Sequence, residues 1–434
     1  MQESPIIAKF PLIFRYEDAK ELGGQLSSHH SVVLIGIKRV GISNFLRFFI
    51  NRKDVIENYV NDSKKHLFIP INLIDLVECE IAPFWTLTLK RIVDAVENSQ
   101  AKEEVKREIR GIFLESIQLQ DLFFTIDSVR NAVKKIIEQG YLPTLFFIRF
   151  DRLGNAVTPE FFANLEGLRD SSHQQLTYVF TSFLPFRRIF PAVSAQAVLA
   201  LAYKSIYFNP SKKEDARIIF NAYKKRYNFK LDEELEKEFL NLVDGHFQYL
   251  QLGLISLHEP DVTIKTKEDL MKSLVTDERV KLQSEELWEN LEKEEQNILL
   301  KVVNKENITR EEKKKGIYLW NTGFVLPDKQ GLKIFSPLFE YYVKERRREE
   351  AKINVTEFSK KELIFFEFLK NNKDIICERE KIIEKVWPEA EELGISDWAI
   401  DKLAARVRSK LKLQDNNFEI QTIKTRGYKL VEVK

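Results

Sequence analysis

The sequence predicts an α/β fold, a doubly wound parallel sheet with a helical lid, followed by two α+β winged-helix domains. Short apolar runs alternate with helical segments in the first half of the chain, and strands that alternate with helices form parallel sheets. Two later segments each run from helices into a hairpin, which is the order of elements in a winged helix. The chain of 434 residues is divided into a core (1–210), a lid (211–283), a middle winged helix (284–345), a charged linker or exposed helix end (346–354) and a C-terminal winged helix (355–434).

The elements of the core follow one another in a regular order. A short helix ends near Gly23-Gly24, and the helix "NFLRFFINR" (44–52) follows the first strand. Residues 83–139 are expected to be helical, and "PEFFANLEGLRD" (159–170) forms the helix after the third strand. The five expected strands are 31–36, 66–73, 144–150, 176–183 and 205–210.

Composition is typical of a globular protein, with 44% hydrophobic and 31% charged residues. The net charge of +2 implies no global partner, so any nucleic-acid contact must come from a local basic patch. No apolar run reaches 18 residues, and the N-terminus "MQESPIIAKF" lacks a secretion signal, so we expect no membrane contact and a cytoplasmic protein. Cys79 and Cys377 are expected to be free, semi-buried thiols in a reducing compartment.

The stretch "GIKRVGIS" (36–43) has the outline of a phosphate-binding loop, whose usual pattern is G-x-x-x-x-G-K-[ST]. Gly36, Gly41 and Ser43 fit the pattern, but Ile42 replaces its lysine. Backbone N–H groups at the helix start still favour an anion. Without the ammonium group that reaches the β- and γ-phosphates, phosphoryl transfer should be severely impaired. Lys38 and Arg39 are the charges inside the loop, and the glycines alone also fit a tight strand-to-helix turn.

This core resembles the STAND branch of the P-loop ATPases over about residues 10–260. Relatives often carry "D-E-F-D" at the end of the third strand. In one register its first two acids fall on Ile148 and Arg149; in the other, Asp151 is the Walker B acid and Arg152 replaces the glutamate. Phe247 stands where the lid of the family has a proline. These departures from the family pattern predict a degenerate P-loop NTPase-like core that hydrolyses no ATP and binds ATP or ADP with Mg²⁺ weakly or not at all. The nucleotide-binding residues that the resemblance implies are Gly36, Gly41, Ser43, Asn44 and Asp151, with a polar sensor at Thr181-Ser182.

Other chemistry is sparse in the sequence. His29-His30 has no partner at metal-ligand spacing, so a surface loop is expected and no metal. The paired arginines of "FLPFRRIF" (183–190) fit an arginine contact to a nucleotide or partner, or an amphipathic surface turn, which we favour. The middle winged helix is expected to pack on the core as a clamp.

The C-terminal unit resembles the OmpR/PhoB-type winged-helix effector domain over nearly its full length. "SKKELIFFEFL" opens the first helix with a capping box formed by Ser359 and Glu362. The second helix, the recognition helix and the wing hairpin follow in the order of the family. Their sequences are "CEREKIIEKVWP", "SDWAIDKLAARVRSKLK" and "IQTIKTRGYKL". The resemblance implies binding to double-stranded DNA.

The recognition helix also has the physical properties of a groove-binding helix. Its apolar residues form one stripe, and a helix of this width fits the major groove, where Arg pairs with guanine. Residues 401–434 carry nine Lys/Arg and four Asp/Glu, whereas residues 355–400 carry seven and eleven. The apolar stripe consists of Ile400, Leu403, Val407 and Leu411.

The DNA contacts that the resemblance implies lie on the recognition helix and the wing. Arg406 matches the base reader, Arg408 and Thr422 the backbone contacts, and Lys424 the wing residue in the minor groove. Trp398, Leu403 and Ala405 depart from the pattern, which predicts modest affinity for each monomer. The full expected set is Lys402, Arg406, Arg408, Thr422, Lys424 and Arg426.

Three functions fit the sequence. The first is a sequence-specific DNA-binding transcriptional regulator, with the degenerate core as scaffold or nucleotide sensor and no phospho-aspartate receiver domain. The alternative is a STAND-type signalling ATPase whose C-terminal winged helix docks a partner. The third is a structural or defence-related scaffold. RNA polymerase, an upstream signalling protein and a second copy of the chain remain open as further partners.

Overall fold

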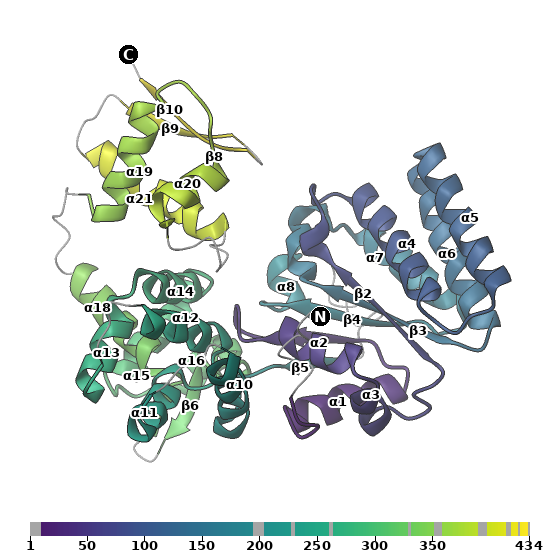
Figure 1. Ribbon diagram of the computed structural model, residues 1–434, viewed down its shortest axis with the longest axis horizontal. Coiled ribbons are helices and arrows are strands. Elements are labelled where there is room, and N and C mark those ends of the chain that lie inside the picture. The colour runs from purple at the N-terminus through teal and green to yellow at the C-terminus, as the bar shows by residue number, and fades with distance from the viewer. Residues whose placement is uncertain are drawn as a thin grey trace. The chain divides into compact units, whose positions relative to one another are not determined.

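The computed structural model describes residues 10–193, 204–226, 231–259, 264–328, 331–350, 358–388, 397–413, 418–423 and 426–432. The chain divides into two compact units, Met1–Tyr341 and Tyr342–Lys434, and each unit is described by itself (Figure 1). Among the described residues, no helix combines the length and the apolar character that crossing a membrane requires.

A five-stranded parallel sheet forms the centre of the first unit, as the alternation of strands and helices predicts. Its strand order is β2-β3-β4-β1-β5. Every residue of β1 and β4 is buried, which explains their continuous apolar runs, since a sheet covered on both faces has no polar side. The strands are β1 (Val32–Ile35), β2 (His66–Asn72), β3 (Leu142–Ile148), β4 (Thr177–Ser182) and β5 (Lys204–Tyr207).

Helices cover both faces of this sheet (Figure 1). The chain crosses the sheet in one direction between β1 and β2 and returns through β3 and β4. Because crossovers between parallel strands are right-handed, the helices that connect β1 to β2 lie on one face and those that connect β2 to β3 and β3 to β4 lie on the other. The first face carries α1 (Tyr16–Ser27), α2 (Ile42–Asn51) and α3 (Lys53–Tyr59); the second carries α4 (Ile81–Glu97), α6 (Leu122–Glu138) and α7 (Pro159–Ser171). The expected helical stretch 83–139 is thus three helices, with α5 (Glu103–Leu119) packed on α4 and α6.

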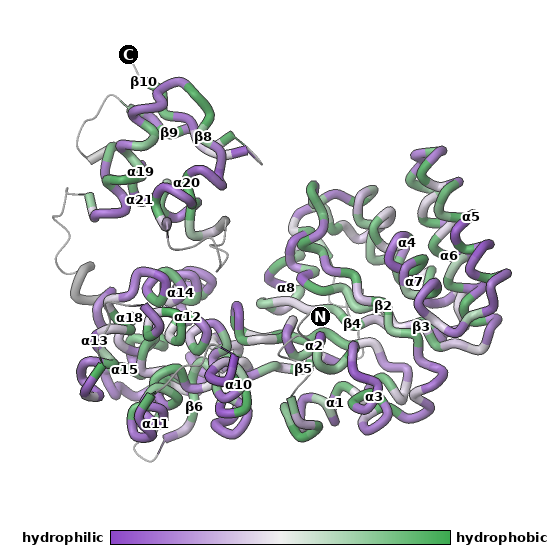
Figure 2. Tube along the Cα trace, viewed as in Figure 1, coloured by the Kyte–Doolittle hydropathy of each residue, from purple (hydrophilic) through white to green (hydrophobic). Residues whose placement is uncertain are grey.

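Aromatic rings fill the space at the carboxyl end of β3. Phe150 begins the 3₁₀ segment η3 (Phe150–Ala156) and lies 4.8 Å from the ring of Phe180 and 5.4 Å from that of Phe186 in the short helix α8 (Phe186–Ile189). Each such ring buries a large apolar area. This packing fixes the turn that carries the neighbouring Asp151. Figure 2 shows the apolar strands inside helices with hydrophilic outer faces.

The rest of the first unit is a helical lid followed by a small helical module with a hairpin, here called the middle module, whose last helix α18 continues past Tyr341. The lid consists of α10 (Lys213–Arg226), α11 (Glu233–Val243), α12 (Phe247–His258) and α13 (Lys267–Thr276). The module consists of α14 (Glu278–Glu289), α15 (Lys293–Val303), α16 (Arg310–Lys315), α17 (Ile317–Asn321), β6 (Val325–Asp328), β7 (Gly331–Ile334) and α18 (Pro337–Glu350).

This module packs on the core and lid. The Tyr318 hydroxyl donates to the Phe183 carbonyl at 2.7 Å, and the Ser336 hydroxyl donates to the Leu242 carbonyl at 2.7 Å. Helix α18 continues into the charged segment expected to be a linker or a helix end, and residues 351–354 of that segment lie outside the described residues.

The second unit has the elements of a winged helix in their expected order. Helix α19 packs on α20 and α21, and the three-stranded sheet has the order β8-β10-β9. Ile400, Leu403, Val407 and Leu411 are all buried, so the apolar stripe of the recognition helix is confirmed. The elements are α19 (Lys360–Asn371), β8 (Cys377–Glu378), α20 (Arg379–Val386), α21 (Asp397–Leu413), β9 (Phe418–Ile423) and β10 (Gly427–Glu432).

The first helix corrects one expectation, because α1 does not end near Gly23-Gly24 but continues to Ser27. Gly23 faces the neighbouring helix α3. A Cβ atom on Gly23 would lie only 2.2 Å from the Tyr59 carbonyl oxygen, whereas a Cβ on Gly24 would meet nothing within 4 Å. Gly23 therefore allows two helices to approach closely and does not mark a helix end.

The two glycines form a matched pair for a stability test. Gly23→Ala should lower the free energy of unfolding by about 1–3 kcal/mol, because the methyl group overlaps the Tyr59 carbonyl. Gly24→Ala should raise it by about 0.5–1 kcal/mol, since alanine favours the helix and the space is open. Urea titrations of both variants measure the difference, and equal effects of the two changes would contradict this account of α1.

Candidate nucleic-acid interface and phosphate loop

The phosphate-loop motif forms a strand–loop–helix turn between β1 and α2. Gly36 follows β1, Gly41 is the N-cap of α2 with φ of 110°, and Ser43 and Asn44 lie in the first helical turn. Ile42, in place of the usual lysine, lies back over the loop. Its Cδ1 would be 3.1 Å from a Cβ atom on Gly36. The apolar side chain is half-buried and lies against the turn.

The lid contacts this loop through the first residues of α12. The Nε2 atom of His246 lies 3.0 Å from the Lys38 carbonyl oxygen, and the Gln248 N–H donates to the Arg39 carbonyl at 3.3 Å. The Phe247 Cβ would lie 3.2 Å from a Cβ on Gly41. Phe247, where the resemblance expects proline, therefore covers the glycine that begins α2.

His246 is held in one neutral tautomer. Its Nδ1 accepts from the Tyr249 N–H at 3.3 Å, so the proton lies on Nε2, which donates to the Lys38 carbonyl. Burial lowers the pKa of His246 to about 3, with a smaller effect of the nearby Arg39 charge in the same direction. The ring joins the lid to the loop as long as it stays neutral.

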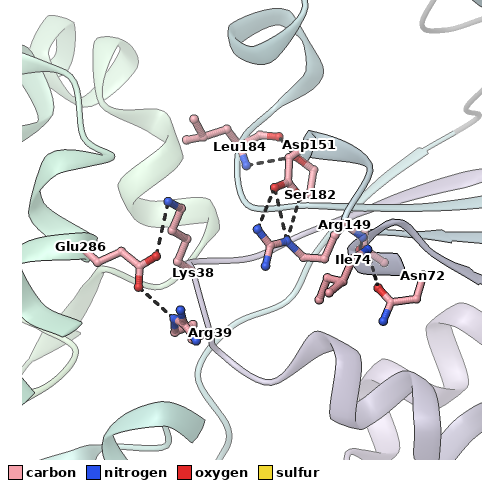
Figure 3. Close-up of polar contacts among 10 residues, drawn as sticks. Lys38, Arg39, Asn72, Ile74, Arg149, Asp151, Ser182, Leu184 and Glu286 are labelled. Carbon is pink, nitrogen blue, oxygen red and sulfur yellow. Dashed lines mark hydrogen bonds and ion pairs between the residues drawn. The ribbon is translucent and has the colours of Figure 1, made fainter. Parts of the chain in front are cut away.

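Both cations inside the loop pair with one carboxylate of α14 (Figure 3). Glu286 lies 3.5 Å from the Lys38 Nζ and 2.9 Å from the Arg39 Nε, and its side chain is only 7% exposed. The Lys38 ammonium also lies 4.5 Å from the Phe183 ring centroid. Burial lowers the pKa of Lys38, and Glu286 opposes that shift. The charges expected to assist a phosphate are therefore held by the middle module.

Asp151 has an arginine partner of its own. The Arg149 guanidinium donates to the Asp151 carboxylate at 3.1 Å, and the Asp151 side chain is only 3% exposed. The Arg149 N–H donates to the Thr181 hydroxyl at 2.8 Å, while the Ser182 hydroxyl donates to the Leu184 carbonyl at 2.6 Å (Figure 3). The expected acid and sensor positions do lie together. Each of these polar groups already has a partner within the core, and a metal ion at Asp151 would compete with Arg149.

The remaining candidates of the core have structural contacts. Arg188 corrects the expectation of a surface turn, because its guanidinium pairs with Glu292 at 2.9 Å and Glu295 at 3.0 Å, both in the middle module. His29 stacks on His66 at 6.0 Å, and burial lowers the pKa of His66 to about 4. Within the described part of the chain, no three His, Cys, Asp or Glu side chains are grouped to hold a metal.

In the second unit, small or acidic residues occupy the most exposed stripe of α21. Asp401, Ala405 and Ser409 are exposed, whereas Lys402 and Arg406 beside them are half-buried. The Lys402 ammonium lies 5.8 Å from the Trp398 ring centroid. The exposed face of the helix therefore has short side chains along its centre and cationic side chains along one edge.

A nearly buried carboxylate organises this cationic edge. Glu362, 4% exposed, lies 2.7 Å from the Lys410 Nζ and 3.6 Å from the Arg406 Nε. It also accepts from the Ser359 N–H at 2.7 Å in the expected capping box. Burial alone would raise the pKa of Glu362, but Lys410, Ser359 and Arg406 together hold it below its ordinary value. Arg406 is therefore positioned by a charge on another helix.

Arg408 connects the recognition helix to the wing. Its Nε donates to the Ile420 carbonyl at 2.7 Å, and a terminal nitrogen donates to the Thr422 hydroxyl at 2.6 Å. Arg426 is exposed between β9 and β10, and Lys424 lies outside the described residues. Arg379 pairs with Asp401 at 2.5 Å, and the Tyr428 hydroxyl bonds to the same carboxylate. These contacts fix the angle between helix and wing.

Sequence reasoning missed the acidic partners of both sites. The capping box identified Glu362, and the spacing of four between Arg406 and Lys410 placed both cations on one helix face, so their shared partner could have been inferred. Glu286 gave no such signal, because 247 positions separate it from Arg39.

The geometry defines an α/β protein with a P-loop ATPase fold and a separate winged-helix unit. Residues 354–430 match the family described as "Transcriptional regulatory protein, C terminal". The second unit is therefore a winged helix of the OmpR/PhoB type, as expected. No curated protein sequence matches the chain.

Several solved structures are similar to this chain. The Walker-type ATPase PABY2304 of Pyrococcus abyssi is 14% identical with a TM-score of 0.48, covering 76% of this chain and 96% of its own. The ORC2 protein of Aeropyrum pernix is 12% identical with a TM-score of 0.46, covering 81% and 99%. The ORC1 protein of the same organism, in complex with DNA, is 10% identical with a TM-score of 0.36, covering 98% and 92%. At these scores the likenesses carry no statement about function.

Protonation of His246 should destabilise the first unit in mild acid. The folded pKa of about 3 lies below the ordinary 6.5, so the unfolded state binds the proton first as the pH falls. The free energy of unfolding should therefore be highest above pH 6.5 and decline toward pH 3, with a limiting slope of about 1.4 kcal/mol per pH unit from this group. Urea titrations at several pH values, compared with His246→Gln, isolate the slope. A variant with the same pH dependence as the parent would contradict this prediction.

Glu286→Gln should expose the loop cations to an added anion. Removing the carboxylate leaves Lys38 and Arg39 beside the helix start, where phosphate oxygens can replace it. ATP should then raise the melting temperature of the variant more than that of the parent, because a ligand that binds only the folded state stabilises it. Glu289→Gln, on the same helix, is the control for the charge change. Equal ATP shifts in all three proteins would show that Glu286 does not compete for the loop.

Proposed function

We propose that this chain is a sequence-specific DNA-binding transcriptional regulator. The observation that carries the proposal is the match of residues 354–430 to the C-terminal domain of transcriptional regulatory proteins. In the geometry of that unit, a recognition helix with a thin exposed stripe lies beside a wing strand. Binding of this kind depends on phosphate contacts for affinity and on base-edge contacts for specificity.

The shape of α21 supports its insertion into the major groove. Ala405 and Ser409 let the helix approach the base edges closely, while Lys402 and Arg406 border the stripe. Arg406 is the residue for a guanine contact, because its guanidinium can bond to two acceptors on that base. Thr422 and Arg426, exposed on the wing, and Lys424 are assigned to the sugar–phosphate backbone.

In this proposal the core is a scaffold, and its only ligand-dependent role would be to sense an anion at the phosphate loop. Lys38 and Arg39 are paired with Glu286, Asp151 is paired with Arg149, and the half-buried Ile42 lies against the loop. None of these groups is poised to transfer a phosphoryl group. The alternative, a signalling ATPase with a docking module at its C-terminus, requires tight ATP binding and turnover, which assays on the purified protein would detect.

Single substitutions on α21 should separate base contacts from phosphate contacts. Binding sites are first selected from random duplexes with the full-length protein. On a selected site, Arg406→Ala should cost about 1–3 kcal/mol and relax one base preference. Lys402→Ala should weaken binding to all sequences alike and reduce the salt dependence by about one phosphate contact.

Lys373→Ala is the matched control for the loss of one positive charge within the same unit. It lies beyond the end of α19 and pairs with Glu432 on β10, so DNA affinity should not change. If no duplex is enriched at low salt, or if all three variants bind as the parent does, α21 is not the DNA-reading element.

A further inference from the structure

Large apolar side chains are exposed together at one end of the helices α4, α5 and α6. Of fifteen such side chains exposed in the described residues, seven come from two short segments, 74–77 and 114–123. Val77 is 87% exposed and Phe123 is 78% exposed. Concentrated apolar exposure of this kind marks interaction surfaces. The seven residues are Ile74, Val77, Leu114, Ile117, Leu119, Leu122 and Phe123.

The same region contains a groove of about 700 Å³. Val77, Leu87, Phe113, Ile117 and Leu122 are among its lining residues, which come from the loop after β2 and from all three helices. Its polar floor is satisfied internally, since the Ser116 hydroxyl donates to the Thr125 hydroxyl at 3.0 Å and the Thr125 hydroxyl donates to the Asp121 carbonyl at 2.8 Å. The groove therefore offers an apolar surface with few polar groups that must stay hydrated.

The rim of the groove is acidic. The segments 73–89 and 111–126 contain five Asp or Glu residues and no Lys or Arg. Lys90 on α4 also lines the groove, together with Asp75, Glu78 and Asp121. Its ammonium pairs with Asp94, and Arg91 on the same helix pairs with Asp75 at 2.7 Å. All five acidic side chains are exposed, and they are Asp75, Glu78, Glu80, Glu115 and Asp121.

We propose that this groove binds an amphipathic helix of a partner protein, with an apolar face that enters the groove and Lys or Arg along its flanks. An apolar groove between helix ends can take the apolar face of an amphipathic helix, as in other helix-in-groove complexes. The acidic rim selects a basic partner, because like charges across an interface cost affinity. The same charge argues against a second copy of this chain, which would bring two acidic rims together. The inference does not depend on DNA binding by the second unit.

A designed peptide tests this site on the full-length protein. The probe is a labelled helix of about 18 residues with leucines at positions i, i+3, i+4 and i+7 and lysines on its flanks. One comparison peptide carries Glu in place of Lys, and a second contains the same residues as the probe in scrambled order. Fluorescence anisotropy should show binding of the amphipathic lysine peptide about tenfold or more tighter than of either comparison peptide.

Exposed substitutions locate the binding without disturbing the core. Val77→Asp and Phe123→Asp should each weaken peptide binding about tenfold or more, since a charge is placed against the apolar face of the peptide. Ile13→Asp, at a side chain that is 68% exposed elsewhere in the first unit, should leave it unchanged. Peptide binding that survives both groove variants, equal binding of the Glu peptide, or a parent dimer that Val77→Asp converts to a monomer would each overturn the proposal.

Discussion

A nearly buried carboxylate shared by two cations organises each unit of this protein. Glu286 lies between Lys38 and Arg39 in the first unit, and Glu362 lies near Lys410 and Arg406 in the second. A carboxylate removed from water is tolerated only when nearby charges and hydrogen bonds offset its desolvation. Each arrangement therefore joins elements that are distant in sequence, and separating those elements would leave a charge buried without compensation.

In the first unit this constraint links three parts that a phosphate loop would otherwise keep independent. The side chains of Lys38 and Arg39 bind α14, while their carbonyl groups bind the start of α12 through His246 and Gln248. The loop thus takes its shape from the lid and the middle module together. An anion that drew the two cations away from Glu286 would weaken the attachment of that module to the core. These contacts couple the shape of the loop to the position of α14.

Local sequence patterns predicted the features that depend on residues close in sequence, namely the strands, the helices and their buried faces. The alternation of apolar runs with helical segments predicted the parallel sheet, and the spacing of Ile400, Leu403 and Val407 predicted the buried face of α21. Contacts between distant segments were not visible. Gly23 looked like a helix end, although its role is set by Tyr59 on another helix, and Glu286 looked like any other acidic residue of a helix. A pattern within one element cannot show which element it will meet.

The position of Arg406 shows how one such contact restrains a side chain for which we propose a base contact. Glu362 restrains the guanidinium before any ligand arrives, which lowers the entropy lost when a long side chain is ordered at an interface. The restraint is also weak enough to release, because the Lys410 ammonium is closer to Glu362, at 2.7 Å against 3.6 Å for Arg406. If Arg406 turns toward a base, Lys410 and the Ser359 N–H still compensate the carboxylate. The buried charge can therefore hold the arginine in the free protein without opposing the base contact that we propose for it.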